Sequence, residues 1–442
     1  MKRKIAGFML ATMLVGCLAG CGSSTDTTSS QTDAAQETTT TEESTVADDN
    51  TAESTDDKET VEINYLTWRS QDGRHPENLI AAFEDKYPYI KVNYQVIKNK
   101  DEYAQAQQVR LLSGADMDLC DIDPTTVQEY IEAGYLLDLT GSDYLNNYLE
   151  GSLDGITVDG KTYGIAGAIN LIGVYYNKTM FEENGIKVPT NYQEYMDAME
   201  AFKQLGMYSA ANGGKDGWPT EFDVYTFFHD LMIRDVDIFS KLDAGEVKYT
   251  DPIFQDVFDK IEAFYKSGYV DPDFLSYTGD DAVNLFVTQK VPMLVQGEWQ
   301  ATVFDDIDLD FEMGVFPVPA ESTDEVVVPV SVGNYISGIS TTEHPEEVKL
   351  FLEFMSSEEG ASLTANGMTA FSPVKGVALE GESKVSLFNE MLNEEKSVPF
   401  FYSCQNATDN SEMLKLLQEL SLGTINASDL TASLQEYHDS NN

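Results

Sequence analysis

Strand and helix patterns alternate from residue 61 onward, and this alternation sets the fold class. Val61, Ile63 and Tyr65 alternate with polar residues, which predicts a half-buried strand. The apolar residues between 79 and 87 then follow helical spacing, and strand-like alternation returns between residues 90 and 96. This order predicts a β-α-β unit with parallel strands. Because similar patterns continue to the C-terminus, we expect an α/β fold.

Further along the chain, residues 163–166 and 174–176 predict two more strands. Thr190, with Gln193 three residues later, predicts a capping box at the start of a helix. Polar loops follow the predicted strands at residues 67–73 and 121–125. Ligands of α/β sheets bind beyond the carboxyl ends of the strands, so these two loops are the predicted location of a binding site.

The amino terminus predicts export from the cell. A basic leader, Met1–Lys4, precedes a mostly apolar run that ends at Leu18, too short for a membrane-spanning helix of roughly 18 or more residues. The following Ala19-Gly20-Cys21 completes a sequence that looks like a bacterial lipobox. We therefore expect residues 1–20 to be a lipoprotein signal peptide and Cys21 to carry the lipid. An ordinary secretory signal is the alternative.

Residues 21–60 predict a disordered tether. From residue 22 they are almost wholly Ser, Thr, Asp, Glu, Ala and Gln, with Val46 as the only large aliphatic residue, so they cannot bury enough apolar surface to fold. A spacer of this kind would hold a domain off the extracellular face of the cell membrane. Its length favours a Gram-positive cell wall.

Length and charge limit what the rest of the chain can be. Residues 61–442 are too many for one hydrophobic core, so two lobes are expected. The formal net charge of −49 argues against a nucleic acid or an acidic lipid as partner, because no basic field would attract phosphates.

Several short segments, in order along the chain, resemble the family 1 extracellular solute-binding proteins, the group that contains maltose- and other oligosaccharide-binding proteins. The segments with this resemblance are Thr67-Trp68, Ile90–Val92, Gly114–Leu119, Asp159–Ile165, Val174–Lys178, Pro189–Tyr192, Met293–Trp299, Met313–Pro319 and His344–Met355. Together they cover nearly all of the chain beyond residue 60.

The resemblance implies a two-lobed periplasmic-binding-protein type II fold, with discontinuous lobes and a hinge. The first lobe would hold residues 61–168 plus 320–370, and the second lobe residues 169–319 plus 371–442. Chain crossings are expected near residues 166–170, 316–320 and 369–374. The protein would be a monomer that carries a carbohydrate to the permease subunits of an ABC importer, with closure of the lobes favoured by ligand.

A sugar site needs aromatic faces for the apolar side of the ring, and carboxylates, amides or Arg for the hydroxyls. The tryptophans Trp68, Trp218 and Trp299 all lie beside polar residues or glycine, and the resemblance is strongest at Trp299. The residues expected to contact hydroxyls are Arg69, Asp72, Asp121, Asp123, Asn170, Tyr175 and Glu298.

Other functions have weaker support. Within binding proteins, a peptide or another polar metabolite is the alternative cargo. A lipid-anchored glycosidase would need a carboxylate pair, but the four histidines are scattered and no catalytic motif occurs, so we expect no enzyme activity, cofactor or metal. Cys120 and Cys404 are expected to be packed thiols, with a disulfide as the alternative.

Overall fold

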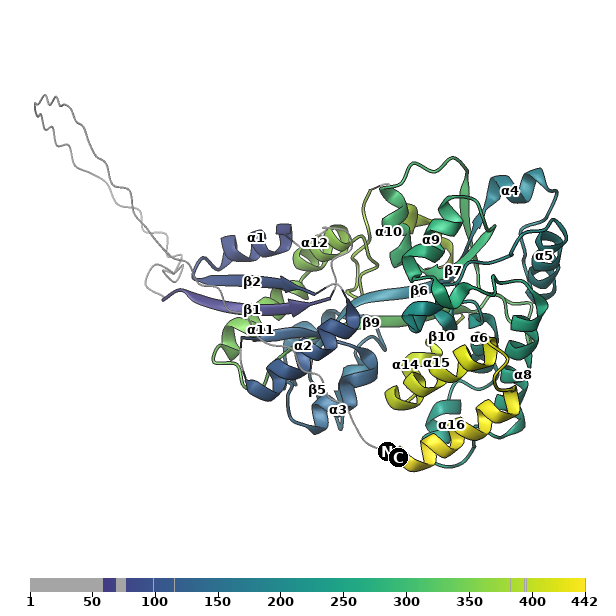
Figure 1. Cartoon of the computed structure of the whole chain (residues 1–442). Helices are drawn as coiled ribbons and strands as arrows, with labels where there is room; N and C mark the ends of the chain where they lie inside the picture. The colour runs from purple at the N-terminus through teal and green to yellow at the C-terminus, as the bar shows by residue number, and fades with distance from the viewer. Residues whose placement is uncertain are drawn as a thin grey trace, which may run out of the picture. The chain divides into compact units, whose positions relative to one another are not determined.

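The computed structural model describes residues 59–68, 77–97, 99–114, 116–381, 383–392, 394 and 396–441 (Figure 1). These residues belong to one compact unit. The predicted signal peptide, the lipid-bearing Cys21 and nearly all of the tether lie outside the described residues, so these expectations stay predictions. In the described part of the chain, no helix has both the length and the apolar character needed to cross a bilayer.

One mixed sheet forms the centre of the molecule, with the strand order β2-β1-β3-β9-β6-β7 and with β8 and β10 attached to β6 and β9. Strands β1, β2 and β3 are parallel, whereas β9, β6, β7 and β8 pair antiparallel. The strands are β1 (Val61–Thr67), β2 (Ile90–Val96), β3 (Leu119–Ile122), β6 (Ile165–Asn177), β7 (Met293–Gly297), β8 (Met313–Pro317), β9 (Val328–Gly338) and β10 (Ser397–Val398), and a separate hairpin is formed by β4 (Thr157–Val158) and β5 (Lys161–Thr162).

Helices cover the sheet, as expected for an α/β fold (Figure 1). The helices are α1 (Glu77–Lys86), α2 (Lys100–Ser113), α3 (Val127–Glu132), α4 (Lys178–Glu183), α5 (Tyr192–Gln204), α6 (Tyr225–Arg234), α7 (Ile238–Asp243), α8 (Pro252–Ser267), α9 (Gly279–Val287), α10 (Trp299–Asp305), α11 (Pro345–Met355), α12 (Glu358–Met368), α13 (Asn389–Leu392), α14 (Phe401–Cys404), α15 (Ala407–Ser421) and α16 (Ala427–Asn441). The predicted β-α-β unit corresponds to β1, α1 and β2.

Buried apolar residues divide into separate cores. One core draws on residues 63–166 and 335–374, and we call the part of the fold around it the first lobe. Two further cores draw on residues 171–328 and 371–434, and we call the part around them the second lobe. Each lobe is therefore assembled from segments far apart in sequence.

Two long strands connect the lobes. β6 pairs with β9 over residues 165–171 and then with β7 and β8 over residues 172–177, so its two halves belong to different lobes. β9 makes the return, because its later residues pair with β3 of the first lobe. Residues 316 and 317, at the start of the range 316–320 where a crossing was expected, still pack with the second lobe, since β8 pairs with β6 there.

The structure corrects two local predictions. Residues 163–166 and 174–176 do not begin two strands, because residues 165–177 form the single strand β6. The helix α5 is capped by Asn191, whose side chain accepts a hydrogen bond from the Glu194 backbone N–H, and not by Thr190. Thr190 instead donates its hydroxyl to the Glu194 carboxylate, which shifts the capping pattern by one residue.

Candidate functional site

The first lobe contributes an aromatic and charged cluster at the end of β1. The ring of Trp68 packs edge-on against Tyr103, with 4.9 Å between centroids, and the Lys100 ammonium lies 5.3 Å from the Trp68 ring. Lys100 also forms an ion pair with Asp123. This residue follows β3 and caps the short 3-10 helix η1 (Pro124–Thr126). Burial raises the pKa of Asp123, but Lys100 and the hydrogen bonds from Thr125 outweigh burial and hold it below its usual range. Asp123 is therefore anionic near neutral pH.

The second lobe presents a group of connected aromatic rings. The ring centroid of Phe222 lies 5.4 Å from that of Trp218 and 6.2 Å from that of Trp299, and both contacts are edge-on. Trp299 starts α10, with Glu298 between it and the end of β7. Its ring folds back over Gly297, where a Cβ atom would lie only 2.0 Å from the ring. Gly297 is thus required for this ring position. Trp218 is 42% exposed, and Trp299 is partly exposed, so both tryptophans keep surface for a ligand.

Glu221 is an unusual acid at the end of η5 (Trp218–Glu221). Its side chain is buried, and its Oε2 atom has no hydrogen-bond partner. Burial raises the pKa of Glu221 from 4.5 to about 8, although Lys100 of the first lobe acts in the opposite direction. The two lobes approach each other nearby, because α14 (Phe401–Cys404) of the second lobe lies against the residues that follow Asp123 in the first lobe.

Tyr402 of α14 marks the same junction. Burial raises the pKa of its phenol well above the ordinary value, and the nearby Tyr225, Glu221, Asp123 and Glu298 raise it further. Asp123 belongs to the first lobe and the other three residues to the second. We therefore define the interlobe site as Trp68, Asp123, Glu221, Trp299 and Tyr402.

Asp121 lies beneath this site and not on its surface. Its side chain is fully buried and accepts hydrogen bonds from Tyr65, from the Thr67 hydroxyl and from the Asn334 amide at 2.8 Å. These partners belong to β1 and β9, the strands on either side of β3. In this structure the Asp121 carboxylate joins three strands and offers no surface to a ligand.

Glu298 and Tyr175 have structural positions as well. The Glu298 carboxylate accepts the Leu171 backbone N–H at 2.7 Å, where β6 passes from one pairing partner to the next. Tyr175 is fully buried between Phe304 and Phe388, and its hydroxyl donates to the Gly297 carbonyl at 2.9 Å. Neither side chain has accessible surface for a ligand in this structure.

Asn170 lies on the hinge strand β6. Its side chain packs over Gly333 of β9, where a Cβ atom would lie 2.3 Å from the Asn170 amide, and its buried Oδ1 atom has no hydrogen-bond partner. Asn334 packs over Gly167 in the same manner, at 2.4 Å. The register of the β6–β9 pairing shifts beside Gly167, so the hinge strands contain an irregularity at the crossing.

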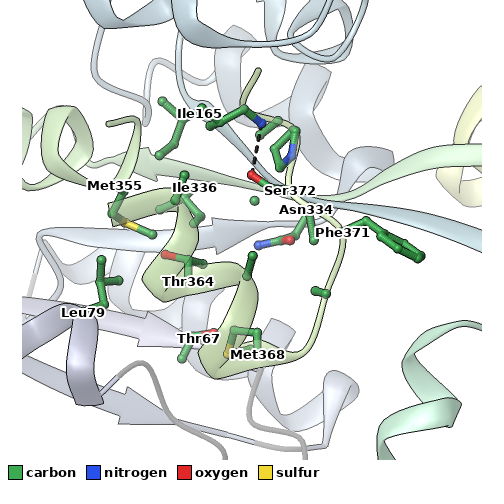
Figure 2. A pocket seen from close by; sticks show the side chains of 18 of the residues that line it. Thr67, Leu79, Ile165, Asn334, Ile336, Met355, Thr364, Met368, Phe371 and Ser372 are labelled. Carbon is green, nitrogen blue, oxygen red and sulfur yellow. Dashed lines mark hydrogen bonds between the residues drawn. The ribbon is translucent and has the colours of Figure 1, made fainter. Parts of the chain in front are cut away.

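A cavity of about 40 Å³ lies behind this crossing, under α12. Figure 2 shows Thr67, Asn334, Phe371 and Ser372 around it, together with apolar side chains such as Met368. A water molecule needs about 10–15 Å³ by this measure, so the space suits a few waters and is far too small for a sugar ring.

Two of the predicted residues, Arg69 and Asp72, lie outside the described residues. Sequence reasoning missed Lys100, Glu221 and Tyr402. The nearness of Glu221 to Trp218 was an available signal, because both fall in one polar segment after a predicted helix. Among the described residues, no group of three or more His, Cys, Asp or Glu side chains is placed to hold a metal ion.

Comparison with known proteins agrees with this architecture. The family of bacterial extracellular solute-binding proteins matches residues 78–387, which is most of the chain, and the protein belongs to this family. A relative from Streptococcus mutans, named multiple sugar-binding protein, is 26% identical over 345 residues, covering 75% of this chain and 77% of the relative.

Solved structures show the same fold. An ABC substrate-binding protein from Listeria monocytogenes, solved in complex with cycloalternan, is 18% identical with a TM-score of 0.70, covering 86% of this chain and 99% of that chain. A Bacillus licheniformis sugar transporter protein, in complex with stachyose, is 20% identical with a TM-score of 0.68 over the same shares. These similarities confirm the two-lobed α/β solute-binding fold that the sequence resemblance implied.

Proposed function

We propose that this protein is the lipid-anchored substrate-binding component of an ABC importer, and that it captures a carbohydrate, in particular an oligosaccharide, at the interlobe site. The observation that carries the proposal is the meeting of partly exposed tryptophans with carboxyl groups from both lobes. The names of the relatives from Streptococcus mutans and Bacillus licheniformis support a sugar as cargo.

The chemistry of the site favours a neutral, hydroxyl-rich ligand. Trp68, Trp218 and Trp299 offer ring faces for the C–H side of a pyranose. Asp123 is anionic and partly exposed, so its carboxylate can accept hydrogen bonds from sugar hydroxyls, whereas Glu221 is buried behind the rings and is not a proposed contact. Lys100 is occupied by Asp123, so the described residues leave no free cation here for an anionic cargo.

Binding would close the lobes by population shift, because contacts from both lobes are made only when they come together. The permease subunits would recognise that closed form. We further propose that Cys21 carries the lipid and that the protein works on the extracellular face as a monomer.

The test uses thermal denaturation of the full-length protein with mono- and oligosaccharides, and with amino acids and peptides as controls. A ligand that binds only the folded state raises the melting temperature. We expect a rise with one class of saccharide, reduced at least tenfold in apparent affinity by Trp299→Ala. Leu422→Ala, which removes a side chain that is 62% exposed at the end of α15, is the matched control and should bind as the wild type does.

Other outcomes would separate the alternatives. A rise with peptides alone would contradict the carbohydrate cargo while leaving the importer role intact. Hydrolysis of a glycoside would contradict both and favour the glycosidase alternative. For the anchor, Cys21→Ala should release the protein from the membrane fraction, and an unchanged distribution would contradict lipidation at Cys21.

A further inference from the structure

The turn between β7 and α10 joins the hinge strand β6 to the interlobe site. The pairing of β6 with β7 ends at Ile172, which lies opposite Gly297. The next contact is made by Glu298, whose backbone N–H donates to the Leu171 carbonyl at 3.0 Å. Leu171 is also the last residue of β6 that pairs with β9. The turn therefore contacts β6 at the residue where this strand changes its pairing partners.

The backbone of Glu298 cannot complete the pairing with Leu171. In a regular antiparallel pair, the Leu171 N–H would donate to the Glu298 carbonyl. Glu298 instead has helical dihedral angles, φ −59° and ψ −25°, and its carbonyl accepts the Ala301 N–H at 2.9 Å. Leu171 is fully buried, and buried backbone N–H groups are nearly always hydrogen-bonded. Its N–H therefore needs another acceptor.

The Glu298 side chain supplies this acceptor. Its carboxyl oxygen accepts the Leu171 N–H at 2.7 Å, so the backbone and the side chain of one residue together replace a strand pair. One residue earlier, the Gly297 carbonyl accepts the Tyr175 hydroxyl at 2.9 Å. Leu171 and Tyr175 both belong to β6, and the side chains of Glu298 and Tyr175 are buried. The two residues before Trp299 are thus fixed to the hinge strand.

We infer, on the basis of the proposed function, that Glu298 is a positioning residue for ligand capture, which fixes the Trp299 ring relative to the hinge strand. Trp299 starts α10, and its ring packs over Gly297 and edge-on against Phe222. A ring that is held in place before binding loses less conformational freedom when a sugar stacks on it. Removal of the Glu298 carboxyl group should therefore weaken binding, although this buried side chain has no surface for the ligand.

The first test follows the Trp299 ring without any ligand. The chain has three tryptophans, so the full-length Trp68→Phe/Trp218→Phe protein keeps Trp299 as its only indole. We expect Glu298→Ala in this parent to lower the fluorescence anisotropy of Trp299 and to increase its quenching by acrylamide, because the turn loses a contact with β6. Glu298→Gln keeps an oxygen that can accept the Leu171 N–H, so it should resemble the parent.

Asp305→Ala is the matched control. Asp305 ends α10, and its carboxylate accepts the Lys384 backbone N–H at 2.8 Å, so this change also removes the acceptor of a distant backbone N–H. It should lower the melting temperature and leave the Trp299 signal unchanged. If Glu298→Ala does not fold, Glu298→Asp is the second variant. It keeps the carboxyl group on a shorter side chain, and it should change the Trp299 signal in the same direction.

The second test measures capture in the chain that keeps all three tryptophans. In calorimetry with the saccharide that stabilises the wild type, Glu298→Ala should raise the dissociation constant on the order of tenfold, whereas Glu298→Gln and Asp305→Ala should leave it nearly unchanged. An unchanged Trp299 signal in Glu298→Ala, or equal changes in Glu298→Ala and Asp305→Ala, would overturn the inference. A more mobile ring with unchanged affinity would overturn it as well. Because the fluorescence test needs no sugar, absence of binding by the wild type would contradict the proposed cargo and not the fixed ring.

Discussion

Replacing Glu221 by Gln should make the protein more stable at alkaline pH relative to the wild type. The wild-type carboxyl is 4% exposed, and burial raises its pKa from 4.5 to about 8. Folding therefore requires this group to hold a proton that the unfolded chain releases above about pH 4.5. The contribution of this proton to the free energy of unfolding is complete below about pH 4.5. It decreases as the pH rises to about 8 and does not change further above that pH.

The expected size follows from the pKa difference. Each pH step of one between the two pKa values costs about 1.4 kcal/mol, so between pH 5 and pH 8 the wild type should lose about 4 kcal/mol relative to Glu221→Gln. Guanidinium unfolding of both proteins at the two pH values measures this, because all other titrating groups cancel in the difference. Glu183→Gln, at an exposed helical position, is the control and should show no such change. A Glu221→Gln difference that is the same at pH 5 and pH 8 would refute the reasoning.

Two substitutions and one labelling experiment test the packing. Gly167→Ala should destabilise the hinge by about 1–3 kcal/mol in urea unfolding, because the new Cβ atom would lie 2.4 Å from the Asn334 side chain; an unchanged midpoint would contradict this. His438→Ala should cost about 3–5 kcal/mol in the same assay, since the fully buried Asp409 carboxylate loses its 2.6 Å contact with the imidazole, and a loss under 1 kcal/mol would argue against it. Burial raises the pKa of the Cys120 thiol to about 12, so mass spectrometry should find it unmodified by a thiol reagent at pH 8 until the protein unfolds, and rapid labelling of the native protein would speak against this packing.

The sequence predicted the local elements of the fold well but missed the length of the hinge strand. The strand and helix periods at residues 61–96 are determined by neighbours in the chain, and the parallel β1–β2 pair follows from them. In β6, Gly167 and Asn170 interrupt the apolar pattern, so the sequence predicts a loop there. They form a strand because the Asn334 side chain of β9 packs over Gly167 and the Asn170 side chain packs over Gly333. These contacts join residues that are distant in sequence.

Site residues were harder to predict than elements, for a similar reason. The sequence does not show whether an aspartate near the end of a strand faces solvent or a buried partner. Asp121 lies within β3 and has such a partner in Asn334. Glu221 looks like an ordinary acid in sequence, although the fold buries it. The three tryptophans lie beside glycine or polar residues and all keep exposed surface, and their contact with a ligand stays a prediction. Cys120 and Cys404 are both free thiols in the described part of the chain.

The most direct test of the proposed function is isothermal titration calorimetry of the full-length protein with the saccharide that raises its melting temperature most. We expect a saturable heat signal from one tight site, which is lost or weakened at least tenfold in Trp299→Ala and kept in Leu422→Ala. Equal affinity for Trp299→Ala and the wild type, or binding of peptides with no binding of any saccharide, would contradict carbohydrate capture at the interlobe site.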